Sequence, residues 1–380
     1  MEKRILICID GSLASVDALE YIGFLLGKGP EVKVDLLHIL PNVPPLFLEP
    51  GESMAEMVQL QDFSERIQEE NRRKASRIMD EARRILTDAG MASANIFPLI
   101  REPSMRVAQD ILDFEQKETH GAIVLGRQGV SALEEFFVGS VTLKVLHHAK
   151  GLPVCVVHGK TDSRRVLVPV VSAPNSKRVL GHVAWLASKA GPLEVTVLHV
   201  VLPLVTGEMT AMWTGLGEME ATIEKRVLED AEDMLSQAKT YLMEHGVPAF
   251  AIETRLEDRA THVGRSILKI ARDGGYGSII IGRRGISRAK QFLFGSVSNK
   301  VVQQADLLIC VGARFDDRVA GVLDHDRVGD REGAVAVTGR AGRQRLGRAH
   351  LGRLVETDRC RRVVVGRVAV AVRIDVGAGL

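Results

Sequence analysis

Cysteine is scarce in this sequence of 380 residues, which contains four: Cys8, Cys155, Cys310 and Cys360. No two of them have CxxC spacing, so we expect neither a disulfide framework nor a zinc site, and a reducing compartment fits. No apolar run approaches the roughly 18 residues that a membrane helix requires. The amino-terminal residues turn polar too early for a secretory signal. These absences predict a cytoplasmic protein without a membrane segment.

A strong net charge is also missing. The formal net charge is +2, which alone argues neither for nor against nucleic acid, and we do not expect a nucleic-acid partner. Apolar residues make up 46% and charged residues 26%, ordinary values for a globular protein. At about 150 residues per domain, the length predicts two to three domains.

The chain contains an internal repeat, which determines the domain organisation. Three segments of a first copy recur in a second at offsets of 161, 161 and 156: residues 4–7 with 165–168, 34–39 with 195–200, and 122–129 with 278–285. A net deletion of five residues in the second copy explains the change in offset. We therefore predict two copies of one domain, at residues 1–157 and 165–313, joined by the polar linker 160–164.

Strand-like and helical stretches alternate within each copy. In the first copy, strands are predicted at 4–9, 32–40, 95–100, 121–125 and 153–157, and helices at 13–27, 53–89, 104–117 and 139–149. Strands that alternate with helices indicate a parallel, doubly wound sheet, because parallel strands need crossover connections. Continuously apolar strands such as 122–125 fit a sheet that is covered on both faces. The predicted fold class is α/β.

A glycine pattern follows one predicted strand in each copy. It reads G-2x-G-9x-G-S, at Gly126, Gly129, Gly139 and Ser140 and at Gly282, Gly285, Gly295 and Ser296. Ligands of such sheets lie beyond the carboxyl ends of the strands. Glycine lets the backbone approach a ligand closely, and the free N–H groups at a helix start bind phosphate. Two equal copies favour a phosphate site over glycines that only permit turns, but the pattern does not name the nucleoside.

With these two motifs and the segment Ile9-Asp10-Gly11-Ser12, the sequence resembles the universal stress protein family over about residues 1–313. The resemblance implies two tandem flavodoxin/Rossmann-like domains, each with a five-stranded sheet, followed by an irregular C-terminal tail. It also implies ATP as ligand, with Mg²⁺ as a candidate companion ion. The last strands of two domains would pair, either within the chain as a pseudo-dimer or between chains as a homodimer.

The family resemblance also assigns roles to single residues of the candidate nucleotide site. Asp10, with Gly11 and Ser12, would approach the adenine, and backbone near Ile39 would contact the base. Val141 follows Gly139-Ser140 at the phosphate end. Within the loops, Arg127 and Arg283 could contact phosphate, since arginine suits bidentate binding, or could be solvated surface charges.

The second copy departs from the family pattern at its first strand, where Val171 aligns with Asp10. Valine cannot accept a hydrogen bond from the adenine amino group, and an unpaired buried donor costs about 1–3 kcal/mol. We expect the first copy to bind ATP and the second to bind it more weakly or to hold another phosphate ligand. Alternatively, Ser172 or a main-chain group replaces the contact and both copies bind.

Three function classes follow from this sequence. The first is a regulatory protein of the stress response in which ATP occupancy alters conformation or the choice of a protein partner. The second is an enzyme with slow hydrolysis of an adenine nucleotide; no catalytic residue or metal ligand is evident, and no Walker A lysine motif occurs. The third is a nucleotide-independent scaffold, against which the intact glycine motifs argue.

Residues 314–380 form a different kind of sequence. They contain 14 Arg, no Lys and 9 acidic residues, a net charge of +5, whereas the first 313 residues carry −3. This basic tail is either a mis-read end that was never selected to fold or a genuine tail that contacts acidic partners or nucleic acid. Residues 305–321 resemble a short segment of the acetohydroxyacid synthase family. No synthase activity follows from 17 residues.

Overall fold

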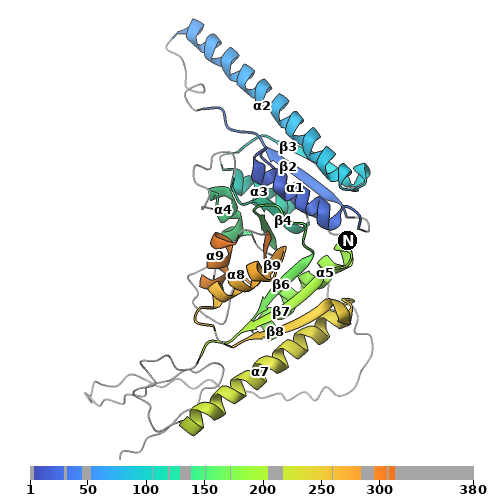
Figure 1. Cartoon of the computed structure of the whole chain (residues 1–380). Helices are drawn as coiled ribbons and strands as arrows, with labels where there is room; N and C mark the ends of the chain where they lie inside the picture. The colour runs from blue at the N-terminus through green and yellow to red at the C-terminus, as the bar shows by residue number, and fades with distance from the viewer. Residues whose placement is uncertain are drawn as a thin grey trace, which may run out of the picture. The chain divides into compact units, whose positions relative to one another are not determined.

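Residues 1–326 cluster into a single compact unit that contains every residue described below. The computed structural model of the chain describes residues 4–29, 32–44, 53–104, 106–118, 120–128, 138–149, 151–171, 173–203, 217–258, 260–283, 295–305 and 308–312 (Figure 1). The basic tail 314–380, predicted to be disordered or non-native, lies outside these residues.

The first copy alternates strands and helices as the sequence predicts. Its elements are β1 (Arg4–Cys8), α1 (Leu13–Leu26), β2 (Val34–Ile39), α2 (Met54–Asp88), β3 (Ile96–Arg101), α3 (Val107–Lys117), β4 (His120–Gly126), α4 (Ser140–His148) and β5 (Val154–Val157). Ser12 is the N-cap of α1, and its hydroxyl accepts a hydrogen bond from the Ser15 N–H.

The second copy has the same order of elements. They are β6 (Arg165–Val170), α5 (Ala173–Ala190), β7 (Glu194–Val200), α7 (Gly217–Glu244), β8 (Ile252–Glu257), α8 (Val263–Asp273), β9 (Ser278–Ile281), α9 (Ser296–Gln304) and β10 (Leu308–Val311). The alignment of the copies holds in detail, since His38 Nδ1 lies 2.8 Å from the Ile9 carbonyl and His199 Nδ1 lies 2.8 Å from the Val170 carbonyl.

All ten strands belong to one sheet, in the order β3-β2-β1-β4-β5-β10-β9-β6-β7-β8. Pairing is parallel within each copy, which confirms the doubly wound α/β fold. The exception is the pair β5–β10, which is antiparallel and brings Val156 opposite Ile309. The two last strands therefore pair within one chain, across an approximate twofold relation between the copies.

Both faces of the sheet are covered, as the continuously apolar strands predict. Along β1, Ile5 and Ile7 belong to a core cluster with residues of α1, α2, α5 and α7, while Leu6 and Cys8 belong to a second cluster with α3, α4, α8 and α9. Each cluster contains residues of both copies. The apolar core is thus continuous across the β5–β10 junction, and burial stabilises the two copies as one unit.

One cysteine corrects an expectation from the sequence. Cys155 is disulfide-bonded, although the sparse, separated cysteines predicted no disulfide. Cys155 lies in β5 directly opposite Cys310 in the antiparallel pair with β10. The sequence spacing of these two residues carries no sign of this proximity, which arises only from the pairing of the copies. Cys8 is a free, buried thiol, and burial raises its pKa.

The sequence predicts no membrane segment, and the hydropathy of the helices can be compared with that expectation. Among the helices in the described ranges, none is both long enough and apolar enough to span a bilayer.

Candidate functional site

The candidate ligand site of the first copy lies at the carboxyl ends of three neighbouring strands. The order β2-β1-β4 in the sheet brings Ile39, Asp10 and Gly126 to one edge. His38 joins two of these ends, because its ring contacts the carbonyl of Ile9, the residue before Asp10. This edge is where parallel α/β sheets bind ligands.

A tight turn connects β1 to α1 and fixes the Asp10 carboxylate. Its Oδ1 accepts hydrogen bonds from Ser12 N at 3.0 Å and Ser12 Oγ at 2.6 Å. Gly11 between them has φ of +79°, a left-handed conformation that favours glycine. The Ser12 hydroxyl also lies 3.4 Å from the Gln128 carbonyl. The turn and the glycine loop are therefore in direct contact.

Gly126 ends β4 where α1 crosses close to the sheet. A Cβ atom at Gly126 would lie 2.7 Å from the Ala14 carbonyl carbon, so this glycine is required by packing against backbone. Its own carbonyl accepts a hydrogen bond from Thr142 Oγ1 at 2.9 Å, which ties α4 to the end of β4. The first glycine of the motif thus has a structural role of its own, whatever its role toward a ligand.

Gly139 and Ser140 form the start of α4, as the motif predicts. Gly139 is the N-cap and its N–H donates to the Arg127 carbonyl at 2.8 Å, which closes the loop between the two ends of the motif. Ser140 is exposed and Val141 is half-buried. The exposed N-terminus offers backbone N–H groups and the positive end of the helix dipole, as an anion site requires.

The second copy builds the same edge with one difference. The Gly295 N–H donates to the Arg283 carbonyl at 3.0 Å, and Ser298 Oγ donates to the Gly282 carbonyl at 2.7 Å. Ser296 is exposed at the first position of α9. At the end of β6, however, half-buried Val171 occupies the place of Asp10. The starts of α4 and α9 match between the copies, whereas the residues that follow β1 and β6 differ in chemistry.

Three residues of the predicted sites lie outside the described residues: Gly129, Gly285 and Ser172. Their predicted roles stay predictions.

The two loop arginines lie between the copies. Arg127 and Arg283 are only 3% and 6% exposed, so neither is a solvated surface charge. Arg127 donates to carbonyls of the second copy, and Arg283 donates to a carbonyl of the first. The sequence analysis did not predict these contacts between the copies. The equivalent positions of the two arginines in the repeat were a signal that both have the same role.

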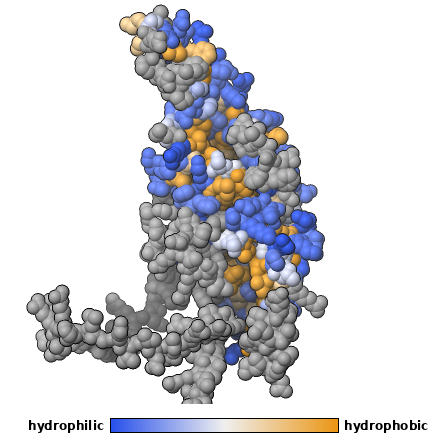
Figure 2. Space-filling view, turned by 90° about the vertical axis from the view of Figure 1, so that its left-hand side faces the viewer, coloured by the Kyte–Doolittle hydropathy of each residue, from blue (hydrophilic) through white to orange (hydrophobic). Residues whose placement is uncertain are grey.

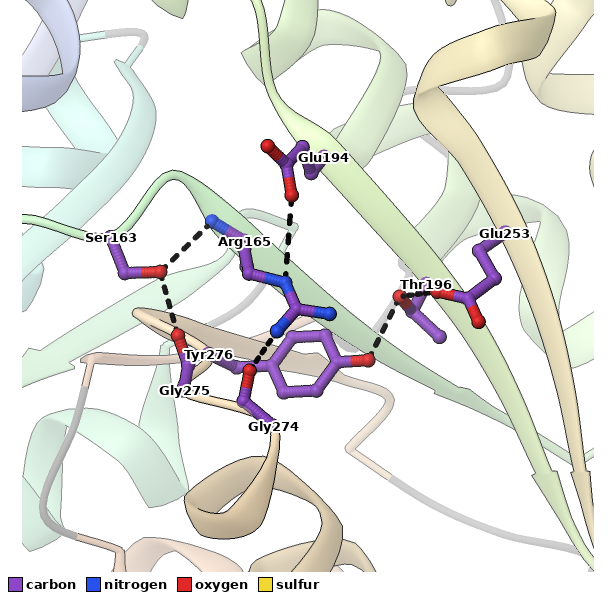
Figure 3. A network of polar contacts seen from close by, with 8 residues as sticks. All are labelled: Ser163, Arg165, Glu194, Thr196, Glu253, Gly274, Gly275 and Tyr276. Carbon is purple, nitrogen blue, oxygen red and sulfur yellow. Dashed lines mark hydrogen bonds and ion pairs between the residues drawn. The ribbon is translucent and has the colours of Figure 1, made fainter.

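A second polar cluster lies at the opposite, amino edge of the sheet. In the first copy the carboxylate of Asp35 contacts buried His120 Nε2 at 3.0 Å and Arg4 Nη1 at 3.2 Å. Their counterparts in the second copy form the network of Figure 3, in which Tyr276 donates to Thr196 at 2.9 Å.

Arg165 belongs to the same polar network of the second copy. Its guanidinium lies 4.6 Å from the centre of the Tyr276 ring and bonds to the Gly274 carbonyl (Figure 3). The repeat therefore keeps these positions polar and replaces the buried contact between Asp35 and His120 with one between two hydroxyl groups. Because both clusters lie at the amino edge, away from the ligand edge, we interpret them as structural.

Metal-ligating side chains do not gather in the part of the chain that the structure describes: no group of three or more His, Cys, Asp or Glu residues there could hold a metal ion.

Comparison with known proteins identifies the family. The model of the "Universal stress protein family" matches residues 1–158 and 163–309. The chain, with its tandem α/β copies and twin glycine loops, belongs to the universal stress protein family.

The chain is also similar to individual proteins. A universal stress protein of Mycolicibacterium smegmatis is 25% identical over 315 residues, which is 82% of this chain and 97% of the relative. A crystal structure of a universal stress protein from Archaeoglobus fulgidus DSM 4304 covers 84% of this chain and 98% of its own, with 21% identity and a TM-score of 0.53, and shares the fold. Another universal stress protein from Archaeoglobus fulgidus, solved in complex with dAMP, is 22% identical and covers 39% of this chain and 96% of its own, with a TM-score of 0.28.

A further match concerns an enzyme. The large subunit of acetolactate synthase isozyme 2 from Escherichia coli is 30% identical over 149 residues, which is 36% of this chain but only 25% of the subunit. The resemblance to this family is thus longer than the 17 residues noted in the sequence. A quarter of a subunit carries no synthase activity over to this chain.

Proposed function

We propose that this protein is a nucleotide-binding regulator of the stress response, located in the cytoplasm, and that ATP binds at the carboxyl edge of the first copy. The observation that carries the proposal is the hydrogen bond from the Gly139 N–H to the Arg127 carbonyl, which holds the start of α4, with its exposed Ser140, near the carboxyl end of β4. Strand β4 pairs with β1, and Asp10 follows β1 with its carboxylate fixed by Ser12. Phosphate would lie at the helix start and adenine at the carboxylate. ATP occupancy would alter the choice of an unidentified protein partner.

The second copy would bind ATP more weakly. It has the same loop closure and the same exposed serine, which supports a phosphate site. The side chain of Val171 offers no acceptor to the adenine amino group. The family motifs and the shared geometry of both phosphate ends support a nucleotide ligand in preference to a nucleotide-independent scaffold.

Isothermal titration of the full chain with ATP tests the proposal. We expect one tight site per chain and, in the D10V variant, an affinity that is roughly tenfold to a hundredfold lower, because a lost hydrogen bond to a buried donor costs about 1–3 kcal/mol. D162V makes the same chemical change in the exposed linker and should leave the affinity unchanged. Two equally tight sites would contradict the asymmetry, and no binding would contradict the nucleotide function.

A further inference from the structure

The main chain of Arg127 makes two hydrogen bonds within its own copy. Its N–H donates to the Val157 carbonyl at 2.8 Å, at the end of β5, and its carbonyl accepts the Gly139 N–H at 2.8 Å. The main chain of Arg127 therefore fixes the glycine loop to both the sheet and the start of α4.

The side chain of Arg127 reaches into the other copy. Its Nη1 donates to the Ala305 carbonyl at 3.0 Å and its Nη2 donates to the Gln303 carbonyl. These carbonyls lie at the C-terminus of α9, where helix carbonyl groups lack helical partners and the dipole is negative. A buried guanidinium is a strong, charge-assisted donor there. One residue thus joins the loop of the first copy to the phosphate helix of the second.

Arg283 makes the reciprocal connection. Its carbonyl accepts the Gly295 N–H at 3.0 Å, which closes the second loop, and its Nη1 donates to the Ala149 carbonyl at 2.5 Å. Ala149 is the C-cap of α4. The charge of Arg283 also reaches His147 in the last turn of α4, whose pKa is lowered first by burial and then by this arginine. The same connection is thus built twice.

The two helices that the arginines hold are short. Each has nine residues, or about 13 Å at 1.5 Å per residue, and each begins at the phosphate end of its own candidate site. A helix of this length moves as a rigid body, so a shift at its C-terminus is transmitted to its N-terminus. Each loop is therefore linked to the opposite site through one side chain and one helix.

We propose that Arg127 and Arg283 couple the two nucleotide sites, so that occupancy of one site changes the ATP affinity of the other. This coupling rests on the proposed nucleotide function and adds a regulatory device to it. A phosphate bound at one loop fixes the loop-closing arginine, and the arginine fixes the position of the opposite phosphate helix. By thermodynamic linkage the effect is equal in both directions.

A local role predicts a different result. If each arginine acts only as a phosphate ligand of its own loop, its substitution changes the affinity of its own copy alone. The coupling proposal predicts a change in the other copy. The two roles are distinguished by blocking one site and measuring the ATP affinity of the other.

The decisive experiment uses full-length chains that carry S296D, which places a carboxylate at the start of α9 to repel phosphate from the second site. ATP binding to the first site is then measured by isothermal titration with and without R283M. Methionine keeps an unbranched, flexible side chain but cannot donate to the Ala149 carbonyl. We expect about a tenfold loss of affinity at the first site, within the usual range of coupling, and a partial return with R283K, which restores a charged donor.

A matched control separates coupling from a loosened interface. The linker residue Arg164 also bridges the copies, because its Nη2 donates to the Phe24 carbonyl of the first copy at 2.8 Å and its Nη1 to the Ala190 carbonyl of the second at 2.6 Å. It belongs to neither loop. In the S296D chain, R164M should leave the first-site affinity unchanged. An equal loss with R164M, or no loss with R283M, overturns the coupling.

A reciprocal pair reads the second site. In chains that carry S140D, which blocks the first site, R127M should lower the ATP affinity of the second site by a similar factor. If R127M lowers ATP affinity only in chains without S140D, Arg127 is a local phosphate ligand and the proposal is overturned. If S296D chains bind no ATP before any arginine is changed, the proposed nucleotide function fails, and the coupling fails with it.

Discussion

The first and third glycines of the loop motif have different reasons to be glycine. Gly126 faces the backbone of Ala14, which cannot move as a flexible side chain could. Gly139 has φ of −56° and ψ of 148°, a conformation that other residues adopt readily. A sequence motif thus combines a glycine that packing requires with one that backbone geometry does not.

This difference predicts that two alanine substitutions differ in their cost to stability. G126A should lower the free energy of unfolding by about 1–3 kcal/mol, because an added methyl group overpacks the contact with α1. G139A should cost less than about 1 kcal/mol, but should weaken ATP binding if the helix start contacts phosphate. Urea unfolding of both variants, with ATP titration of G139A, checks the prediction, and equal stabilities would contradict it.

His199 gives the protein a pH-dependent stability. Burial lowers its pKa below the ordinary value of 6.5, and the Val170 carbonyl offsets part of that shift. Below pH 6.5 the unfolded chain takes up a proton that the folded chain resists, so the free energy of unfolding decreases as the pH falls. Urea midpoints from pH 7.5 to 5 should fall less steeply for H199N than for the wild type. Parallel curves would show that His199 does not contribute.

At the scale of elements, α2 is much longer than the strands beside it. Its 35 residues span about 52 Å, whereas the six residues of β3 span about 20 Å. The apolar residues of its second half are buried in the core or packed against it, but four in its first half are exposed: Met54, Met57, Val58 and Phe63. Hydrophobic atoms are visible at the top of Figure 2, the end at which α2 begins.

The two halves of α2 should therefore differ in their contribution to stability. L86A, in the half that is buried against the sheet, should lower the free energy of unfolding by about 2–5 kcal/mol, because it leaves a cavity. V58A, in the exposed half, should change it by less than about 0.5 kcal/mol. Chemical unfolding of both variants measures the difference; a large cost for V58A would mean that the first half is also packed.

At the scale of the whole molecule, contacts that cross between the copies are spread over both edges of the sheet. Besides the loop arginines, the Tyr21 hydroxyl in α1 donates to Ser278 in β9 at 3.0 Å, and burial raises the pKa of Tyr21 to about 12. The continuous core and the β5–β10 pair add to these contacts. We therefore expect the two copies to unfold together.

The disulfide of Cys155 should strengthen this cooperativity. A cross-link between distant parts of a chain restricts the unfolded state and typically contributes about 2–4 kcal/mol. C155S should therefore lower the urea midpoint, and the reductant dithiothreitol should lower it in the wild type but not in C155S. Non-reducing peptide mapping should find Cys155 linked to Cys310, its neighbour across the strand pair. A free Cys155 would contradict the disulfide.

The sequence by itself determined the repeat, the order of strands and helices, and the family. Apolar runs, glycine spacing and capping residues act over a few neighbouring residues, so they can be read directly. The loop motif was predicted for the same reason, and Gly139 and Ser140 lie at the start of α4 as the motif requires.

Only the tertiary structure decided how the two copies meet. The contacts of Arg127, Arg283 and Cys155 join segments more than 100 residues apart, and the local sequence around each residue carries no sign of its partner. An arginine in a phosphate-loop motif was therefore open to a phosphate role, whereas the folded chain directs its side chain to the helix end of the other copy. The physical reason is that the register of β5 on β10, which no local pattern specifies, fixes which groups face each other.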